Sequence, residues 1–259
     1  MGAEAFYERT TDGFHPTEYV TGPWDPRMSH AGPPAALLIN EIDAAVPGME
    51  ITKVSFEIPR GIPKVPYRIM VDVVRPGRRI QHVDAAIVDP DGSTLMSASA
   101  SCIRFLDAPT LPVGEAPPLD LRPPEDCEPL SFRITSGLGY MDGVEMRTAE
   151  GTPFRGGPAA IWIRQVIPLI GGEATDPMTR CGLFGDLGNG ISALAPFNEL
   201  LCINTDLSLY IARNPESDWI GMRSTTVTSG LGLGMTDSVV YDASGFVARA
   251  NQSIFFDRS

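Results

Sequence analysis

Two segments of this 259-residue chain follow the same order of predicted elements, and this internal repeat limits the folds that the chain can adopt. Residues 51–105 and 201–256 each have the pattern of three strands, a turn and a fourth strand. An Asp-and-Gly turn occurs at matching places, at Asp89–Gly92 and Asp242–Gly245. One short apolar helix candidate precedes each segment. A repeat of this length predicts two domains of one fold that pack as a pseudo-dimer.

Composition excludes several classes of protein. Apolar residues make up 43% of the chain and charged residues 20%, which is typical of an ordinary globular protein with room for two cores. The formal net charge of −12 argues against nucleic-acid binding, which needs a basic surface. The sequence has no apolar run long enough to span a bilayer. Its first residues are polar and acidic, without the pattern of a signal peptide.

Cysteine and histidine are sparse. The cysteines are Cys102, Cys127, Cys181 and Cys202, and the histidines are His15, His30 and His82. Without a Cys-x-x-Cys pair or a histidine cluster, the chain has no metal-binding signature and no disulfide framework. We therefore expect no metal, no cofactor and a reduced, cytoplasmic location.

A proline-rich stretch separates the two copies. Residues 109–129 contain seven prolines and no periodic apolar pattern. Because proline fixes φ and lacks an N–H donor, we expect this stretch to be an extended linker that does not pair in a sheet. The predicted organisation is an N-terminal domain over residues 1–108 and a C-terminal domain over residues 130–259.

The two helix candidates differ in how they begin and end. Pro33–Val46 is apolar nearly all round, so this helix should be buried, and Pro47-Gly48 ends it. The second candidate begins at Asp176-Pro177 and continues to about Leu187, where Gly188–Gly190 favours a helix end. Strand patterns follow both helices. The simplest fold class is α+β, with each helix wrapped by an antiparallel sheet and the two sheets paired edge to edge.

Two polar residues of the second copy lie in apolar surroundings. Asp186 lies inside the second helix candidate, where a buried carboxylate is costly unless hydrogen-bonded or functional. In the last strand, alternation places Gln252 on the apolar face with Ile254, whereas Arg249 and Asn251 face outward. An inward amide needs a partner, and Asp186 is the natural candidate. A purely structural hydrogen bond between the two side chains remains an alternative.

A further polar pair opens the strand expected beside the helix. By alternation Thr205 shares a face with Leu207 and Leu209, so Thr205 rather than Asn204 should point inward, unless a bulge re-aims the strand end. Pairs of this kind are also common in ordinary turns.

The first copy lacks these polar residues. Its helix has Pro33 and Pro34 about where Asp186 would align, and Ser99 lies near the place of Gln252. It has instead Ser29-His-Ala-Gly32 before the helix, where free backbone N–H groups could hold an oxyanion. His30 could be a base, although a capping or packing role is the more usual one. Nucleophile elbows, Walker loops and dinucleotide loops are absent.

Taken together, the motifs resemble the double-hotdog acyl-CoA thioesterases of the thioesterase II (TesB-like) type over nearly the whole chain. The matching motifs are Gly22–Trp24, His30–Leu38, Arg75–Arg78, Ala160–Arg164, Asp186–Gly190, Asn204–Asp206 with Trp219, and Val247–Gln252. The resemblance implies the double-hotdog fold, hydrolysis of acyl-CoA and self-association, with a homodimer as the expected state.

The resemblance also implies roles for individual residues. In that family an Asp, a Thr and a Gln bind and polarise the attacking water, and these positions fall on Asp186, Asn204 and Gln252. Asn204 departs from the family's Thr, and Thr205 is the alternative for that role. We expect Asp186 to be the general base.

Substrate-binding residues are expected in the first half. His30, Ala31 and Gly32 are candidates for meeting the oxyanion, with Gly32 acting across the domain interface. The densest group of cations is Arg75, Arg78 and Arg79, which could bind the anionic coenzyme A.

Two alternatives stay open. One is a non-catalytic acyl-CoA- or lipid-binding hotdog protein. The other is a hydratase or dehydratase acting on enoyl or hydroxyacyl thioesters, whose relatives pair a carboxylate with a histidine near the same helix. No histidine follows His82, so the second half cannot supply that pair from its own residues.

Overall fold

A computed structural model describes residues 4–105, 114–133, 137–196 and 199–257 of the chain. One large sheet contains β3 (Met49–Glu57), β4 (Arg68–Arg75), β5 (Ile80–Val88), β6 (Thr94–Arg104), β7 (Glu128–Leu130), β8 (Val144–Glu150), β9 (Ala159–Gln165), β10 (Leu201–Asn204), β11 (Asp206–Ile211), β12 (Ile220–Thr228), β13 (Leu233–Asp242) and β14 (Gly245–Asp257). The helices are α1 (Gly32–Ala45), α2 (Thr179–Gly185) and α3 (Gly188–Ile191), and a separate hairpin is formed by β1 (Tyr7–Thr10) and β2 (Gly13–Pro16). Three short 3₁₀ turns are η1 (Glu18–Val20), η2 (Pro124–Asp126) and η3 (Tyr140–Asp142).

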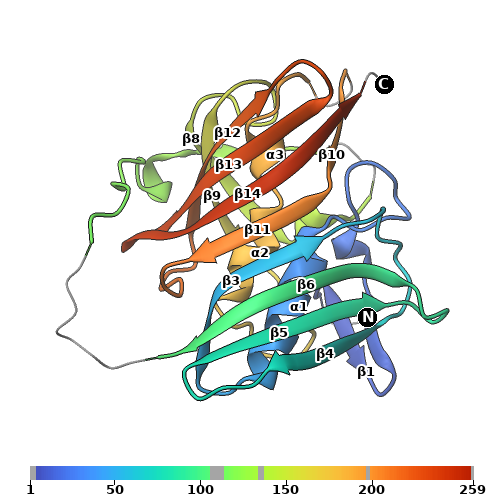
Figure 1. Cartoon of the computed structure of the whole chain (residues 1–259). Coiled ribbons are helices and arrows are strands. Elements are labelled where there is room, and N and C mark those ends of the chain that lie inside the picture. The colour runs from blue at the N-terminus through green and yellow to red at the C-terminus, as the bar shows by residue number, and fades with distance from the viewer. Residues whose placement is uncertain (1–3, 106–113, 134–136, 197–198, 258–259) are drawn as a thin grey trace.

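The two halves share a single sheet. Its order is β4-β5-β6-β3-β11-β14-β13-β12-β9-β8-β7, with β10 also pairing with β14. The halves meet where β3 and β11 pair antiparallel with Ser55 opposite Ser208, and the two hydroxyls are 3.1 Å apart. Both α1 and α2 lie behind this sheet (Figure 1). The predicted α+β fold class, two helices wrapped by antiparallel sheets that pair edge to edge, is confirmed.

The matching turns of the repeat are built by the same side-chain chemistry. The Asp89 carboxylate accepts hydrogen bonds from the N–H groups of Asp91 and Ser93, and the Asp242 carboxylate accepts one from Ser244. Each turn ends on a glycine with positive φ, 84° at Gly92 and 117° at Gly245. These turns set the pairing of the strands on either side.

The two helices differ as their sequences do. The first helix forms nearly as predicted, with both prolines in its first turn and a mostly buried surface. The second is shorter than predicted and is interrupted: α2 ends at Gly185, and the chain starts a new short helix, α3, at Gly188. The glycines predicted to end the helix therefore open α3, and Asp186 lies at the junction rather than inside a continuous helix.

The helices of the two halves approach closely because small residues line their contact. A Cβ added to Gly182 would lie 2.9 Å from the backbone nitrogen of Ala36 and 2.9 Å from a methyl group of Ile39. A Cβ on Gly32 would lie 2.2 Å from the carbonyl oxygen of Leu183. Such contacts leave no room for a side chain, so the glycines set how near α1 can come to α2.

The expectation that no residue of 109–129 pairs in a sheet is wrong for its last residues. Glu128 and Pro129 belong to β7, which pairs with β8 at the edge of the sheet, where a missing N–H is tolerated. The described part of the stretch also packs against the second half, since the indole N–H of Trp162 donates to the carbonyl of Arg122 at 2.6 Å. Residues 106–113 lie outside the described part, and the domain boundaries stay a prediction.

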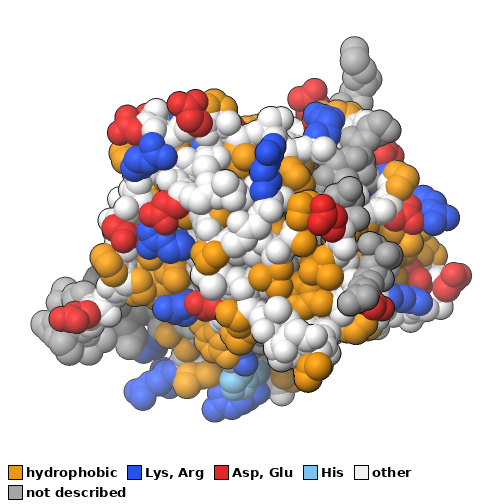
Figure 2. All heavy atoms as spheres, turned by 90° about the horizontal axis from the view of Figure 1, so that it is seen from above, with side chains coloured by type: hydrophobic (Ala, Val, Ile, Leu, Met, Phe, Trp, Pro, Cys, Tyr) orange, Lys and Arg blue, Asp and Glu red, His pale blue; other side chains and the backbone are white. Residues whose placement is uncertain are grey.

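No helix in the described part of the chain is long and apolar enough to cross a membrane. On the face shown in Figure 2, acidic and basic side chains lie mainly near the edges, and hydrophobic and uncharged groups cover the centre.

Replacing Gly182 with valine tests the helix contact. We expect Gly182→Val to lower the free energy of unfolding by about 1–3 kcal/mol, because the added side chain would force α1 and α2 apart. Urea denaturation would measure this change. Gly114→Ala is the matched control, since nothing lies near its added Cβ. An unchanged unfolding midpoint for Gly182→Val would contradict the described packing.

Candidate active site

The candidate site is centred on the Asp186 carboxylate. Asp186 lies where α2 ends, and only 8% of the residue is exposed. Its Oδ1 accepts a hydrogen bond of 2.7 Å from the Asn204 amide and one of 3.3 Å from the Gln252 amide. Its Oδ2 lies 3.2 Å from Nδ1 of His30. A buried carboxylate is thus held by groups from three separate segments of the chain.

Gln252 is the most enclosed polar member of the site, at 2% exposed. The strand alternation predicted this inward position, and Arg249 and Asn251 bond to Asp237 on the other face. The Gln252 amide nitrogen also donates to the carbonyl of Asp186 at 3.1 Å, and its oxygen accepts from the N–H of Asn189 at 3.0 Å. Both ends of the side chain are therefore occupied by protein groups.

The prediction from alternation that Thr205 points inward is wrong. The strand is interrupted at Thr205, which is exposed and donates its hydroxyl to the carbonyl of Ser253. Asn204 lies opposite Ile254, whereas Ser208 lies opposite Asn251, so four steps along one strand match three along the other. This one-residue bulge reverses the alternation and turns Asn204 toward Asp186.

Asn189 belongs to the same cluster, although the motif Gly188-Asn-Gly190 predicted only a helix end. Its side-chain amide donates to Oδ1 of Asn204 at 3.2 Å, and its backbone N–H bonds Gln252. Asn189 is 8% exposed. The spacing of three residues from Asp186 was the available signal, because positions three apart share one face of a helical turn.

His30 reaches the site from the first half. Its ring stacks on Tyr140, with centroids 4.1 Å apart, and Tyr140 donates its hydroxyl to the carbonyl of Leu183 at 2.8 Å. The structure therefore forms a carboxylate–histidine pair between His30 and Asp186, which the second half could not form alone. Burial lowers the pKa of His30, although the Asp186 carboxylate acts in the opposite direction. Burial and the charge of Asp186 raise the pKa of Tyr140.

Two groups compete for one nitrogen of His30. The N–H of Gly32 donates to Nδ1 at 3.0 Å, which requires an unprotonated nitrogen, while the Asp186 carboxylate near it favours a proton there. The Gly32 N–H is thus engaged by the protein when Nδ1 is unprotonated. Ala31, the third residue of this turn, is half-buried.

The first half has apolar residues where the second has polar ones. With Ser55 matched to Ser208 across the β3–β11 pair, strand register matches Gln252 to Ala100 and Thr236 to Val83. The same register shows that Ser99 matches the outward Asn251, so the placement of Ser99 near the position of Gln252 is off by one residue. The polar asymmetry that the sequence indicated is present in the core.

The three arginines are not brought to this cluster. Arg75, Arg78 and Arg79 are exposed at the end of β4 and in the turn that follows. β4 is the outer strand of the first half, four strand positions from β11, or roughly 19 Å at ordinary strand spacing. Their part in binding coenzyme A stays a prediction.

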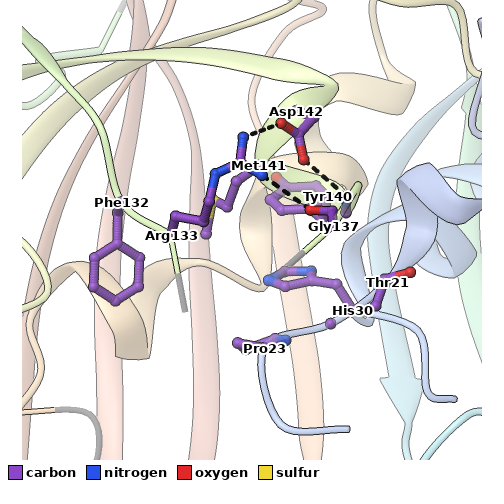
Figure 3. A pocket seen from close by; sticks show the side chains of 11 residues that line it. Thr21, Pro23, His30, Phe132, Arg133, Gly137, Tyr140, Met141 and Asp142 are labelled. Atoms are coloured by element: carbon purple, nitrogen blue, oxygen red, sulfur yellow. Dashed lines mark hydrogen bonds and ion pairs between the residues drawn. The ribbon is translucent and has the colours of Figure 1, made fainter. Parts of the chain in front are cut away.

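Two hollows lie in the described part of the chain, and the charges that line them differ in how well they suit an anionic substrate. One lies between the halves, with about 350 Å³ of space that is partly open to solvent (Figure 3). Its lining residues are Thr21, Gly22, Pro23, His30, Phe132, Arg133, Gly137, Gly139, Tyr140, Met141 and Asp142. Arg133 is paired with Asp142 there. The larger hollow lies on the outer face of the first half and is lined by Glu57, Asp72 and Asp84, whose charges repel phosphates.

In the part of the chain that is described, no group of three or more His, Cys, Asp or Glu side chains is placed to hold a metal ion. The cluster around Asp186 consists of one carboxylate, three side-chain amides and an imidazole.

Comparison with known families identifies the family of the chain. A model of the acyl-CoA thioesterase N-terminal domain matches residues 20–103, and one of the C-terminal domain matches residues 124–256. The chain belongs to the acyl-CoA thioesterase family. It is a thioester hydrolase with acyl-CoA as its substrate class, as the resemblance of its motifs predicted. This membership disfavours a non-catalytic lipid-binding protein.

Solved structures share the fold. A conserved protein of unknown function with a hot dog fold from Alicyclobacillus acidocaldarius has a TM-score of 0.74 at 15% identity, covering 98% of this chain and 96% of that one. A tesB protein from Mycobacterium avium subs paratuberculosis has a TM-score of 0.67 at 16% identity, with coverage of 97% and 96%. An acyl-CoA thioesterase II from Mycobacterium marinum has a TM-score of 0.65 at 16% identity, with coverage of 86% for both chains. A search of curated proteins found no match.

The buried histidine predicts how stability depends on pH. The lowered pKa of His30 means that the unfolded chain, at the ordinary value of 6.5, binds the proton first as the pH falls. The free energy of unfolding should therefore decrease between about pH 7 and about pH 5, and His30→Gln should show a shallower decrease. Urea denaturation at both pH values measures the two slopes. Equal slopes would show that His30 is not held neutral by the fold.

Proposed function

We propose that this acyl-CoA thioesterase hydrolyses its substrate by direct attack of a water molecule that Asp186 activates as general base. The observation that carries the proposal is the position of the carboxylate. It is buried between the two halves, with one oxygen held by two amides and the other left for a ligand next to His30. An acceptor fixed in this way needs little reorganisation when it takes a proton.

The reaction balances without a covalent intermediate. One O–H bond of the water breaks as its proton passes to Asp186, and the water oxygen forms a bond to the thioester carbonyl carbon. The tetrahedral intermediate then collapses with cleavage of the carbon–sulfur bond. The products are the free acid and coenzyme A, whose leaving thiolate takes up the proton from Asp186 and so restores the carboxylate.

The first half supplies the environment of the carbonyl oxygen. His30 and Tyr140 line the hollow between the halves, and His30 contacts Asp186, so we assign the approach of the thioester to this hollow. The Gly32 N–H becomes available to an oxyanion when Nδ1 of His30 carries a proton, because Nδ1 can then no longer accept from it. Protonation of Nδ1 of His30 thus frees the Gly32 N–H, and loss of that proton engages it again.

Several finer expectations remain proposals. They are a homodimer, a cytoplasmic location, a role in lipid metabolism and binding of coenzyme A by Arg75, Arg78 and Arg79. The arginine cluster is exposed, as a site for an anionic ligand requires.

Removing the charge of Asp186 tests the mechanism. We expect Asp186→Asn to lower kcat by about 10²- to 10⁴-fold, because the variant keeps the shape but not the base. Release of free thiol from a panel of acyl-CoA substrates measures the rate. Asp237→Asn is the matched control, an outward carboxylate whose loss should leave kcat unchanged. A normal turnover number for Asp186→Asn would refute the assignment.

The His30–Asp186 pair favours a second candidate, hydration of enoyl thioesters, since a carboxylate with a histidine suits proton transfer to carbon and oxygen. We expect hydrolysis rather than hydration, because the chain belongs to the acyl-CoA thioesterase family and the Asn204 and Gln252 amides hold one oxygen of the carboxylate. Loss of the conjugated enoyl absorbance in the presence of the protein would measure hydration. Hydration faster than thiol release would favour the second candidate.

A further inference from the structure

One buried polar atom beside Asp186 has no hydrogen-bond partner in the described part of the chain. It is Oδ1 of Asn189. The other polar groups of this residue are used, since the backbone N–H bonds Gln252 and the side-chain Nδ2 bonds Asn204. Leaving one buried acceptor unpaired among so many satisfied groups is costly, and such an atom indicates a ligand.

The orientation of the Asn189 amide follows from the chemistry of its neighbours. An ionised Asp186 only accepts hydrogen bonds, so Asn204 must turn its Nδ2 toward the carboxylate. The oxygen of Asn204 then faces Asn189, which must present its own Nδ2. The unpaired end of Asn189 is therefore an oxygen and cannot be exchanged for the nitrogen without losing a bond.

The carboxylate and the Asn189 amide are close neighbours. They contact the nitrogen and the oxygen of the single Asn204 amide, at 2.7 and 3.2 Å. Of the two carboxylate oxygens, Oδ1 accepts from both amides, whereas Oδ2 has His30 as its one neighbour of this kind among the described residues. Oδ2 of Asp186 and Oδ1 of Asn189 are thus the acceptors that the cluster leaves for a small donor.

We propose that Asn189 is a catalytic residue whose Oδ1, together with Oδ2 of Asp186, holds the attacking water. This inference rests on the proposed thioesterase function. A water molecule has two O–H groups, one for each acceptor, and its lone pair is left to attack the carbonyl carbon. The hydrogen facing Asp186 leaves as the carbon–oxygen bond forms, and the hydrogen facing Asn189 stays on the new carboxyl group until the product ionises.

The same contacts assign Gln252 a positioning role and not that of holding the water. Its nitrogen donates to the carbonyl and the carboxylate of Asp186 and its oxygen accepts from the N–H of Asn189, so both ends of the side chain are held by the protein. Gln252 is then a positioning residue that ties the junction after α2 to β14. The water is oriented by Asn189 instead.

A double-mutant cycle separates water binding from positioning. We expect Asn189→Ala to lower kcat by about 10- to 100-fold with little change in KM. In the Asn204→Ala background, Asn189→Ala should lower kcat further by about 10-fold, because it removes a separate contact to the water. If Asn189 acted only by holding Asn204, the second substitution would have no further effect, which would overturn the proposal.

Asn251→Ala is the matched control. Asn251 lies next to Gln252 on the outward face and bonds Asp237, so its loss should leave kcat unchanged. The failure of this inference is distinct from failure of the proposed function. If Asp186→Asn is inactive while Asn189→Ala turns over normally, the function stands and the role of Asn189 is refuted.

A crystal structure of the native chain tests the inference without any substitution. We expect an ordered water within about 3.2 Å of both Asn189 Oδ1 and Asp186 Oδ2. A well-defined cluster with the same contacts and no water between these two atoms would overturn the proposal.

Discussion

The antiparallel pairing of β3 with β11 is the constraint on which the rest of the structure depends. It makes one sheet from two, so the apolar faces of both copies point to the same side and both helices lie there (Figure 1). The glycines of α1 and α2 then allow the helices to touch. The turn before α1 is brought against the end of α2 as a result, and His30 meets Asp186. An isolated half would have only part of this arrangement.

Much of the fold is predictable from the sequence because its signals are local. Proline at the start of α1, Asp-and-Gly turns and period-two strands each specify structure within a few residues. Two features of the fold were not predicted from the sequence. The Gly188–Gly190 motif predicts a helix end but not that a new helix, α3, starts there. The pairing of β7 depends on the free sheet edge at β8, which lies elsewhere in the sequence.

In the candidate site, too, residues with local signals were predicted correctly and residues that depend on distant segments were not. Gln252 is predictable because alternation is undisturbed near the middle of β14. Asn204 and Thr205 are not, because a single inserted residue reverses the facing, and the sequence does not show a bulge whose cause is the register of another strand. His30 was a candidate from its place before α1. Its contact with Asp186 depends on the joining of the halves, as does the use of the Gly32 N–H by the imidazole.

The bulge at Thr205 also bears on how this chain should be compared with its relatives. Matching residues by type along this strand would set Thr205 against the family's threonine, one position away from the side chain that actually contacts Asp186. The position that faces Asp186 is set by its distance along the strand from the residues that pair in β11. The residue type at that position does not decide it. Matching by position, which sets Asn204 against the family's threonine, instead selects the side chain that bonds Asp186.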